Sequence, residues 1–472
     1  MMGLNFQKLK NNPIYIFLFL FALVSIYIVI CYDGTGDAGD SIQHYQFAKY
    51  APLHPELFFN HWAKPVYTLL ASPFAQFGFI GIKVFNALVS LLTLFFTFRA
   101  VKKLGLKNAL FAPVILLFSP LFFVFTFSGL TEPLFALFLS IGLFLILSKK
   151  LVLSSIIISF LPFIRSEGLL LIGIFGFYLL LKKEWRTIPY LLLGHLAYSI
   201  AGYFVFKDLF WVFNEIPYAH LSSTYGEGEL NHFVKQLLYV VGVPIYLLFW
   251  VGTLALILKS IKRRINVELQ ILVFLGFFAF LIAHSLFWYL GIFNSMGLKR
   301  VLIGVLPLLS IISLIGYNFL TEEALKTKKR TKYFVQGLLI LYALVFPFTS
   351  NPAAINWQSE LSLNEDQKLI HKVALFLENE SDKNPRYVFA HPYLSEALEI
   401  DPFDEQKKLE LTQEGLQYIN TGDIVIWENW FAVVENGVTQ SMLDSNNDLI
   451  KMHSASVRAR GREIVYVIYK RK

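Results

Sequence analysis

The stretch PIYIFLFLFALVSIYIVICYDGTGDAGDSIQHYQ, residues 13–46, contains the two features that decide the predicted fold. Its first part, 14–32, is an apolar run about as long as a membrane-spanning helix. No small-residue cleavage site follows this run, so we expect a retained first helix and not a secretory signal peptide. Directly after it, Asp37 and Asp40 lie among glycines and a histidine. Two carboxylates so close to the end of a span raise the question of what they bind.

The composition of the whole chain is that of a membrane protein. Of its 472 residues, 56% are hydrophobic and 16% are charged, whereas soluble domains carry about 25% charged residues. A chain this apolar must expose much of its surface to lipid, so we predict a polytopic protein surrounded by membrane lipids. The only cysteine, Cys31, excludes an intrachain disulfide and a cysteine metal site.

Eleven apolar runs predict about eleven transmembrane helices, although several runs are shorter than the roughly 20 residues of a full span. If the N-terminus is cytoplasmic, the inside segments carry 20 lysines and arginines and the outside loops between spans carry seven. This bias predicts a cytoplasmic N-terminus and an extracytoplasmic C-terminal region. It also accounts for much of the net charge of +8, so nucleic acid is not an expected partner. The runs are 14–32, 79–98, 108–127, 133–148, 151–164, 168–181, 188–206, 236–258, 270–290, 301–319 and 333–349.

The C-terminal region has the pattern of a separate soluble domain, so we divide the chain into a membrane domain, 1–350, and an extracytoplasmic domain, 351–472. Asn364 and Gln367 form a capping-box pattern that predicts a helix running to about Glu380. The stretches RYVFAH, GDIVIWEN and EIVYVIYK are typical of strands between turns. The predicted fold class is therefore a mainly α, polytopic membrane protein with a small α/β or α+β domain at its C-terminal end.

The first long outside loop, between the first two spans, contains both aspartates. If a helix begins near Asp40, His44 lies one turn later on the same face. The apolar residues that follow suit a helix on the membrane surface, and a second such segment, 64–78, is interrupted by Pro73. The alternative is that Asp40 caps its helix and Asp37 is a turn residue.

Charged residues recur at the outer ends of later spans. Glu132 begins a predicted helix, with Thr131 as its cap. Arg165 and Glu167 occupy a turn between two short apolar runs, where an interfacial anchor is the alternative to a functional site. The second long outside loop, 207–235, mixes aromatic residues and glycines, which is typical of a flexible lid over a polar ligand but also of an ordinary surface loop.

These elements, in this order, resemble the GT-C glycosyltransferase superfamily, whose multi-span members take sugar from a polyprenyl-phosphate carrier. The resemblance covers about residues 10–350 and rests on GDAGDSIQHY, FSPLFFVFTFSGLTEPLFALFL, the RSEG turn and YGEGELNHF, together with the paired surface segments. It implies a sugar donor on a lipid phosphate and inversion at the anomeric carbon. The family often has an Asp-Glu pair where this chain has Asp40 and Ser41. That departure leaves open whether Asp37 or Asp40 has the main role.

We assign catalysis to Asp40, with Asp37 second, because a carboxylate base near the acceptor would activate a sugar hydroxyl. Outside-facing cations suit the carrier phosphate. Histidines suit phosphate, sugar hydroxyls or, together with the aspartates, a divalent metal, but the spacing matches no standard metal motif and no cofactor is certain. No glycine-rich phosphate loop precedes a helix, which disfavours a nucleotide-sugar donor. The predicted substrate-binding residues are His44, His61, Lys64, Glu132, Arg165, Glu167, His220, Tyr225, His232, Lys299 and Arg300.

The resulting prediction is a mannosyltransferase-like membrane enzyme that transfers a hexose or pentose to an extracytoplasmic glycan, lipid or protein, in a bacterial inner membrane. The competing class is a multi-span transporter or flippase, which usually has ionisable residues near the bilayer midplane. Here the spans are nearly free of charge, and Lys83 and His195 are the main exceptions. A third class, an inert scaffold subunit, would not need the acidic loop.

Overall fold

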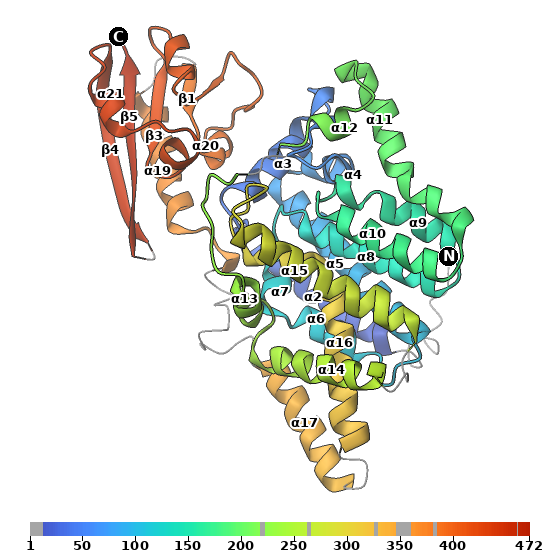
Figure 1. Cartoon of the computed structure of the whole chain (residues 1–472). Helices are drawn as coiled ribbons and strands as arrows, with labels where there is room; N and C mark the ends of the chain where they lie inside the picture. Colours follow the sequence, from blue (N-terminus) through green and yellow to red (C-terminus); the bar gives the residue numbers. More distant parts are fainter. Residues whose placement is uncertain are drawn as a thin grey trace, which may run out of the picture.

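The computed structural model describes residues 13–217, 222–261, 266–324, 329–345, 360–380, 385–459 and 461–472. A large helical part is joined by a smaller part that contains a β-sheet near the C-terminus (Figure 1). We call the smaller part, from residue 360 onward, the sheet domain. The predicted domain boundary at 350/351 and the predicted site residue His220 lie outside the described residues.

Among the described residues, six helical segments are long and apolar enough to cross a membrane, and three shorter apolar helices accompany them. This mainly helical, polytopic architecture makes the chain an integral membrane protein. The six segments are α2 (Pro13–Cys31), α5 (Gly78–Lys103), η3 with α11 (Trp185–Leu192 and Leu193–Phe206), α14 (Val243–Ile261), η4 with α15 (Leu269–Leu275 and Gly276–Tyr289), and η5, α16 and η6 (Lys299–Val305, Leu306–Asn318 and Phe319–Ala324). The shorter helices are α8 (Glu132–Leu147), α9 with η2 (Leu151–Ser159 and Leu161–Phe163) and α10 (Gly168–Leu181).

Two of the predicted apolar runs are not single helices. The run 108–127 forms α6 and α7, which are separated where Pro120 removes a backbone donor. The run 236–258 is divided between α13 and α14 at Gly242, whose φ of +77° suits glycine. The remaining helices outside the sheet domain and the first loop are α6 (Phe111–Leu117), α7 (Pro120–Phe125), α12 (Trp211–Asn214), α13 (His232–Val241) and α17 (Lys329–Val345).

The segment formed by η5, α16 and η6 is the centre of the helical part. In its most apolar 18-residue stretch 89% is buried inside the protein, whereas the corresponding value for α2 is 28%. Glycines allow α14 and α16 to approach closely. A Cβ at Gly252 would lie 1.9 Å from the Ile312 carbonyl oxygen, and one at Gly316 would lie 2.1 Å from the Leu248 carbonyl oxygen. Small residues at helix contacts are a common means of packing in lipid. Because η5 begins this central segment, the same packing fixes the side chain of Arg300.

The first loop contains two short helices, α3 (Asp40–Tyr50) and α4 (Pro65–Ala75), with the turn η1 (Pro55–Phe59) between them. Helix α3 begins at Asp40, as predicted. The prediction that Pro73 interrupts the second segment is wrong, because α4 continues through it and ends two residues later. A proline so near the end of a helix removes a single hydrogen bond. Both helices lie at one end of the helical part, which we call the loop end (Figure 1).

The sheet domain has five strands in the order β2-β1-β3-β5-β4. Strand β1 is parallel to β2 and β3, and β5 is antiparallel to β3 and β4. The three predicted strands are confirmed as β1, β3 and β5, whereas β2 and β4 were not predicted. The strands are β1 (Tyr387–Phe389), β2 (Lys408–Glu410), β3 (Ile424–Glu428), β4 (Leu449–Ala459) and β5 (Arg462–Arg471); the helical elements are α19 (Glu365–Glu380), α20 (Pro392–Ala397), η8 (Gly415–Tyr418), η9 (Phe431–Glu435) and α21 (Gln440–Asp444).

Helix α19 opens with the predicted capping box. The N–H of Asn364 donates to Gln367 Oε1 at 3.2 Å, and the N–H of Gln367 donates to Asn364 Oδ1 at 2.8 Å. The side-chain amide of Gln367 also donates to Thr35 Oγ1 at 2.9 Å. The start of this helix is therefore attached to the first loop.

Further contacts fix the sheet domain on the first loop and α3. The N–H of Gly34 donates to the Leu361 carbonyl at 2.7 Å, and the Gln46 amide donates to the Pro392 carbonyl at 2.9 Å. Ile42 is fully buried and belongs to the same hydrophobic core as the residues that line α19 and the sheet. The first loop is thus held between the helical part and the sheet domain.

Candidate active site

The two aspartates of the first loop lie in a tight turn that leads into α3. Gly36 has a φ of +75°, and a Cβ at this position would lie 2.6 Å from Ser128 Cβ, so glycine is required. Asp37 Oδ1 accepts the N–H of Gly39 at 2.7 Å, as a turn residue does. The N-cap of α3 is Gly39, whose carbonyl accepts the N–H groups of Ile42 and Gln43 at 3.0 Å, so Asp40 is the first residue of the helix and follows the cap position. The alternative that Asp40 is present as a cap is therefore wrong.

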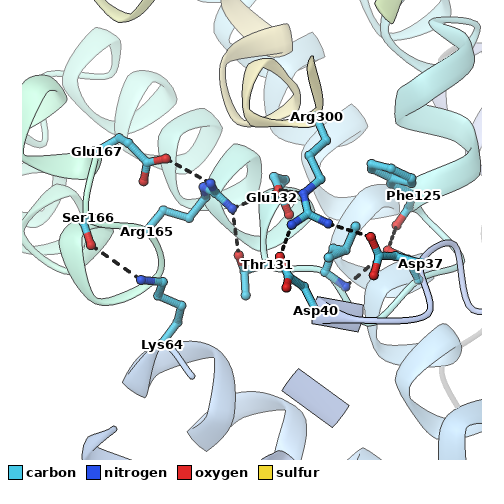
Figure 2. Close-up of polar contacts among 12 residues, drawn as sticks. Asp37, Asp40, Lys64, Phe125, Thr131, Glu132, Arg165, Ser166, Glu167 and Arg300 are labelled. Carbon is cyan, nitrogen blue, oxygen red and sulfur yellow. Dashed lines mark hydrogen bonds and ion pairs between the residues drawn. The ribbon is translucent and has the colours of Figure 1, made fainter. Parts of the chain in front are cut away.

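The guanidinium of Arg300 holds both aspartates (Figure 2). Its Nη1 donates to Asp37 Oδ2 at 2.9 Å, and its Nη2 forms an ion pair with Asp40 Oδ2. Burial opposes ionisation of the Asp40 carboxyl, but the neighbouring positive charges, that of Arg300 foremost, together with the hydrogen bond from Arg300 lower the pKa of Asp40 on balance. Asp40 is therefore ionised at neutral pH, and Arg300 is placed between carboxylates before any ligand arrives.

Glu132 is a buried carboxylate shared by two arginines. Its side chain is 0% exposed, and Oε1 lies 2.8 Å from Arg165 Nη1 and 3.5 Å from Arg300 Nε. The predicted capping role of Thr131 is wrong, because its hydroxyl makes no cap bond and instead accepts from Arg165 Nη1 at 3.3 Å. A buried carboxylate is stable when it is paired in this way. Glu132 thus joins the two cations into one network.

Arg165 extends the network away from Asp37. Its Nη2 donates to Glu167 Oε1 at 2.9 Å, and the same oxygen lies 3.7 Å from Nε2 of His284 on α15. Burial opposes both charges, yet their attraction raises the pKa of Arg165 and lowers the pKa of Glu167 to about 2. The side chains are 16% and 17% exposed, so neither extends into solvent as an interfacial anchor would.

Lys64 is the third cation of the site. It precedes α4 with a φ of +67°, a conformation uncommon for a residue other than glycine, and such backbone strain is often found at functional sites. Its Nζ lies 3.5 Å from Ser166 Oγ, and Figure 2 shows the side chain directed toward the turn that carries Arg165. Burial lowers the pKa of Lys64 to about 8, although Glu167 opposes the shift.

His44 and His61 lie beside the cations but are enclosed by aromatic rings. His44, one turn after the start of α3 as predicted, stacks on Trp62 with ring centroids 4.9 Å apart, and burial lowers its pKa to about 3. His61 packs against Trp211 at 4.9 Å, and burial lowers its pKa to about 4. His44 Nδ1 and His61 Nε2 have no hydrogen-bond partner among the described residues. Each histidine therefore offers a neutral ring nitrogen to a ligand and no positive charge.

The predicted residues of the later loops have partners elsewhere. His232 Nε2 lies 2.7 Å from a backbone carbonyl oxygen, and the Lys299 ammonium lies 5.8 Å from the ring centroid of Tyr239. The Tyr225 hydroxyl donates to Glu435 Oε1 of the sheet domain at 2.6 Å. This last contact ties the second long loop to the sheet domain, close to the first loop. A substrate-binding role for these residues stays a prediction.

Seven charged side chains form what we call the charge network. The charges of its four carboxylates and three cations nearly cancel. Its cations suit a phosphate, and its carboxylates suit hydroxyl groups. Among the described residues, no group of three or more His, Cys, Asp or Glu side chains is arranged to hold a metal ion, and the predicted divalent metal stays a prediction. The members are Asp37, Asp40, Lys64, Glu132, Arg165, Glu167 and Arg300.

Two residues at the site were missed in the sequence. Ser41 Oγ donates to the Thr35 carbonyl at 2.6 Å and accepts the N–H of Gly129 at 2.6 Å, so this small side chain connects the first loop to the turn before α8. The only indication of Ser41 in the sequence was its position, where GT-C glycosyltransferases often have glutamate. His284 contacts Glu167 from within an apolar span, and an isolated histidine in such a span was the available signal.

No protein-family model and no curated protein matches the sequence of this chain. Solved structures similar to it include two of ArnT. ArnT from Cupriavidus metallidurans bound to undecaprenyl phosphate is 11% identical, with a TM-score of 0.59, over 96% of this chain and 98% of that chain. ArnT from the same organism in the apo state is 10% identical, with a TM-score of 0.60, over 96% and 97% of the two chains. The likeness shows the fold, sheet domain included, and confirms the GT-C-like polytopic architecture that the sequence predicted.

Proposed function

We propose that this chain is a glycosyltransferase that moves a sugar from a polyprenyl-phosphate carrier to an extracytoplasmic glycan, lipid or protein, with inversion at the anomeric carbon. The observation that supports this most is the charge network, in which cations suited to a phosphate lie next to two aspartates suited to a hydroxyl. The fold shared with ArnT, one structure of which holds undecaprenyl phosphate, supports a carrier of this class.

The carrier phosphate would bind at Lys64 and Arg165. As the bond between the anomeric carbon and the phosphate oxygen breaks, negative charge grows on the phosphate and needs positive charge or N–H donors more than a proton. Lys64, with a pKa of about 8, is largely protonated at neutral pH. Arg165 Nε is buried and has no hydrogen-bond partner among the described residues. One N–H donor of Arg165 is therefore available to an incoming phosphate.

Asp40 would accept the proton of the acceptor hydroxyl, and Asp37 would orient that hydroxyl. The acceptor oxygen attacks the anomeric carbon from the side opposite the phosphate, which accounts for inversion, and its proton passes to Asp40. Because Arg300 lowers the pKa of Asp40, this carboxylate is a weak base. Proton transfer would therefore accompany formation of the new bond and not precede it.

The basic residues of the predicted inside segments support a cytoplasmic N-terminus, and so an extracytoplasmic site in a bacterial inner membrane. The transferred sugar would be a hexose, as in mannosyltransferase-like enzymes, or a pentose. The charge network lies at the loop end of the bundle, whereas transporter sites are usually built near the midplane of the spans. This position supports an enzyme over a transporter or flippase.

A transfer assay tests the proposal. Purified protein in detergent is incubated with radiolabelled undecaprenyl-phosphate hexoses and pentoses and with an envelope extract of the producing cells as the source of acceptor. We expect label in the acceptor fraction and equimolar release of undecaprenyl phosphate, and neither with Arg300→Ala. Proteoliposomes that move the labelled lipid between leaflets, without any transfer of label, would instead identify a flippase.

A further inference from the structure

A cleft of about 1260 Å³ lies between the first loop and the sheet domain. Gly36, Asp37 and Ala38 form one wall, and the start of α19, the end of β3, the end of β4 and the start of β5 form the other. Asp37 is therefore both a member of the charge network and a lining residue of this interdomain cleft, whereas Asp40 does not line the cleft. The cleft leads to the reaction centre from the side of the sheet domain.

Two carboxylates, the buried Glu428 and the partly exposed Asp366, form hydrogen bonds within the sheet-domain wall. Glu428 is 2% exposed, and its two oxygens accept the N–H groups of Trp430 at 2.6 Å and Ala432 at 2.7 Å. Asp366 Oδ2 lies 3.1 Å from His391 Nε2, whose other ring nitrogen accepts a backbone N–H. These bonds are satisfied within the protein, so the wall is preorganised before a ligand binds.

Trp430 presents the one large exposed aromatic ring among the residues that line the cleft. The side chain is 42% exposed, and the guanidinium of Arg462 lies 5.9 Å from a ring centroid of the indole. The next residue, Phe431, contacts the first loop, since its Cζ would lie 3.1 Å from a Cβ at Gly39. The backbone of Trp430 is thus one residue away from a contact with the loop that carries both aspartates.

The polar side chains that line the cleft include both donors and acceptors. Arg458 can donate and Glu463 can accept, and Lys368 and Glu365 form an ion pair at 2.7 Å that offers both a donor and an acceptor. Sugar hydroxyls both donate and accept, and the apolar face of a sugar ring stacks on an aromatic ring. This combination favours a carbohydrate over a peptide.

We propose that the interdomain cleft binds the carbohydrate headgroup of the acceptor, with Trp430 as the stacking surface and Asp37 at the end nearest the reaction centre. This inference rests on the proposed function and adds to it the class and the entry side of the acceptor. Asp37 then receives the acceptor hydroxyl in the cleft and presents it to Asp40, which the same arginine holds.

The test measures binding of fluorescently labelled full-length protein in detergent to an array of defined glycans and defined peptides. Trp430→Ala is compared with Tyr418→Ala, which removes another exposed aromatic ring of the sheet domain that does not line the cleft. We expect the wild-type protein and Tyr418→Ala to bind a set of glycans equally. Trp430→Ala should bind them about two- to tenfold more weakly, the scale of one aromatic contact.

Undecaprenyl phosphate binding, measured on the same samples, separates this inference from the proposed function, and circular dichroism verifies that each variant is folded. Loss of glycan binding in Trp430→Ala with unchanged undecaprenyl phosphate binding supports the cleft. Peptide binding in place of glycan binding, glycan binding that Trp430→Ala leaves unchanged, or no glycan binding by the wild-type protein overturns it. A wild-type protein that binds glycans but not undecaprenyl phosphate refutes the donor class and leaves the cleft as a carbohydrate site.

Discussion

Replacing Asp40 with asparagine tests whether this carboxylate is the base. The substitution nearly preserves shape and removes the proton-accepting charge. A positioned base contributes typically about 10²–10⁴-fold to the rate. Asp40→Asn also loses its charge-assisted contact with Arg300, and a hydrogen bond to a charged group is worth roughly 1.5–3 kcal/mol. The observed loss therefore combines two effects, which a second variant must separate.

Asp37→Asn is the matched control, because Asp37 is held by the other terminal nitrogen of the same guanidinium, at 2.9 Å. It loses the same kind of contact and leaves Asp40 in place. We expect Asp37→Asn to lower kcat/KM about tenfold to a hundredfold, the equivalent of one charge-assisted contact. We expect most of that loss in the KM for acceptor, because Asp37 orients the hydroxyl. Asp40→Asn should lose a further 10²–10⁴-fold, in kcat, the typical share of a base.

The assay is release of undecaprenyl phosphate from a radiolabelled donor, with acceptor concentration varied to separate kcat from KM. Thermal unfolding in detergent, followed by circular dichroism, shows whether the two variants lose equal stability, as the symmetric contacts with Arg300 predict. Equal kinetic losses in Asp37→Asn and Asp40→Asn would refute the base assignment, since Asp40 would then act only as a partner of Arg300. Near wild-type transfer by Asp40→Asn would remove it from the active site altogether.

Three further predictions concern the donor side and the topology. Arg165→Lys keeps a charge but not the fork that contacts two carboxylates, so donor kcat/KM should fall about tenfold to a hundredfold; unchanged donor kinetics would argue against a phosphate contact. Since Lys64 binds phosphate in its charged form and has a pKa of about 8, donor affinity should decline as pH rises through that value, and Lys64→Arg should move the decline upward. A pH profile of Lys64→Arg that matches the wild type would assign the decline to another group. In a background with Cys31→Ser, an impermeant thiol reagent should label Ser441→Cys and not Lys103→Cys in intact cells, and the reverse pattern would invert the orientation.

The sequence predicted the fold well where one periodicity dominated. Long apolar runs identified the spans, and the capping box and the apolar strands β1, β3 and β5 identified the start and centre of the sheet domain. Strand β4 was missed because polar residues interrupt it and none of its 11 residues is buried, so its pairing with β5 decides its structure. The division of the run 108–127 at Pro120 was visible in the sequence, but apolar content was given more weight.

The sequence predicted which residues belong to the site but not how they contact one another. Arg300 is far from Asp37 and Asp40 along the chain, so the ion pairs between its guanidinium and the two carboxylates depend on tertiary packing. Arg300 was assigned to phosphate because an outside-facing cation at a span end suits a headgroup, and nothing local indicated three carboxylate partners. The contribution of the sheet domain was missed for the same reason, since a contact such as Tyr225 with Glu435 has no pattern in the sequence.

The attachment of the first loop to the sheet domain has a consequence for biosynthesis. The aspartates emerge from the ribosome with the first tenth of the chain, but the groups that fix their loop, such as the Leu361 carbonyl and the Gln367 amide, are made near the end of translation. A nascent chain that has inserted all its spans therefore still lacks an ordered active site. Under the proposed function, the chain would become competent only after its last segment had folded onto the first, and an incompletely synthesised copy in the membrane would not consume lipid-linked sugar.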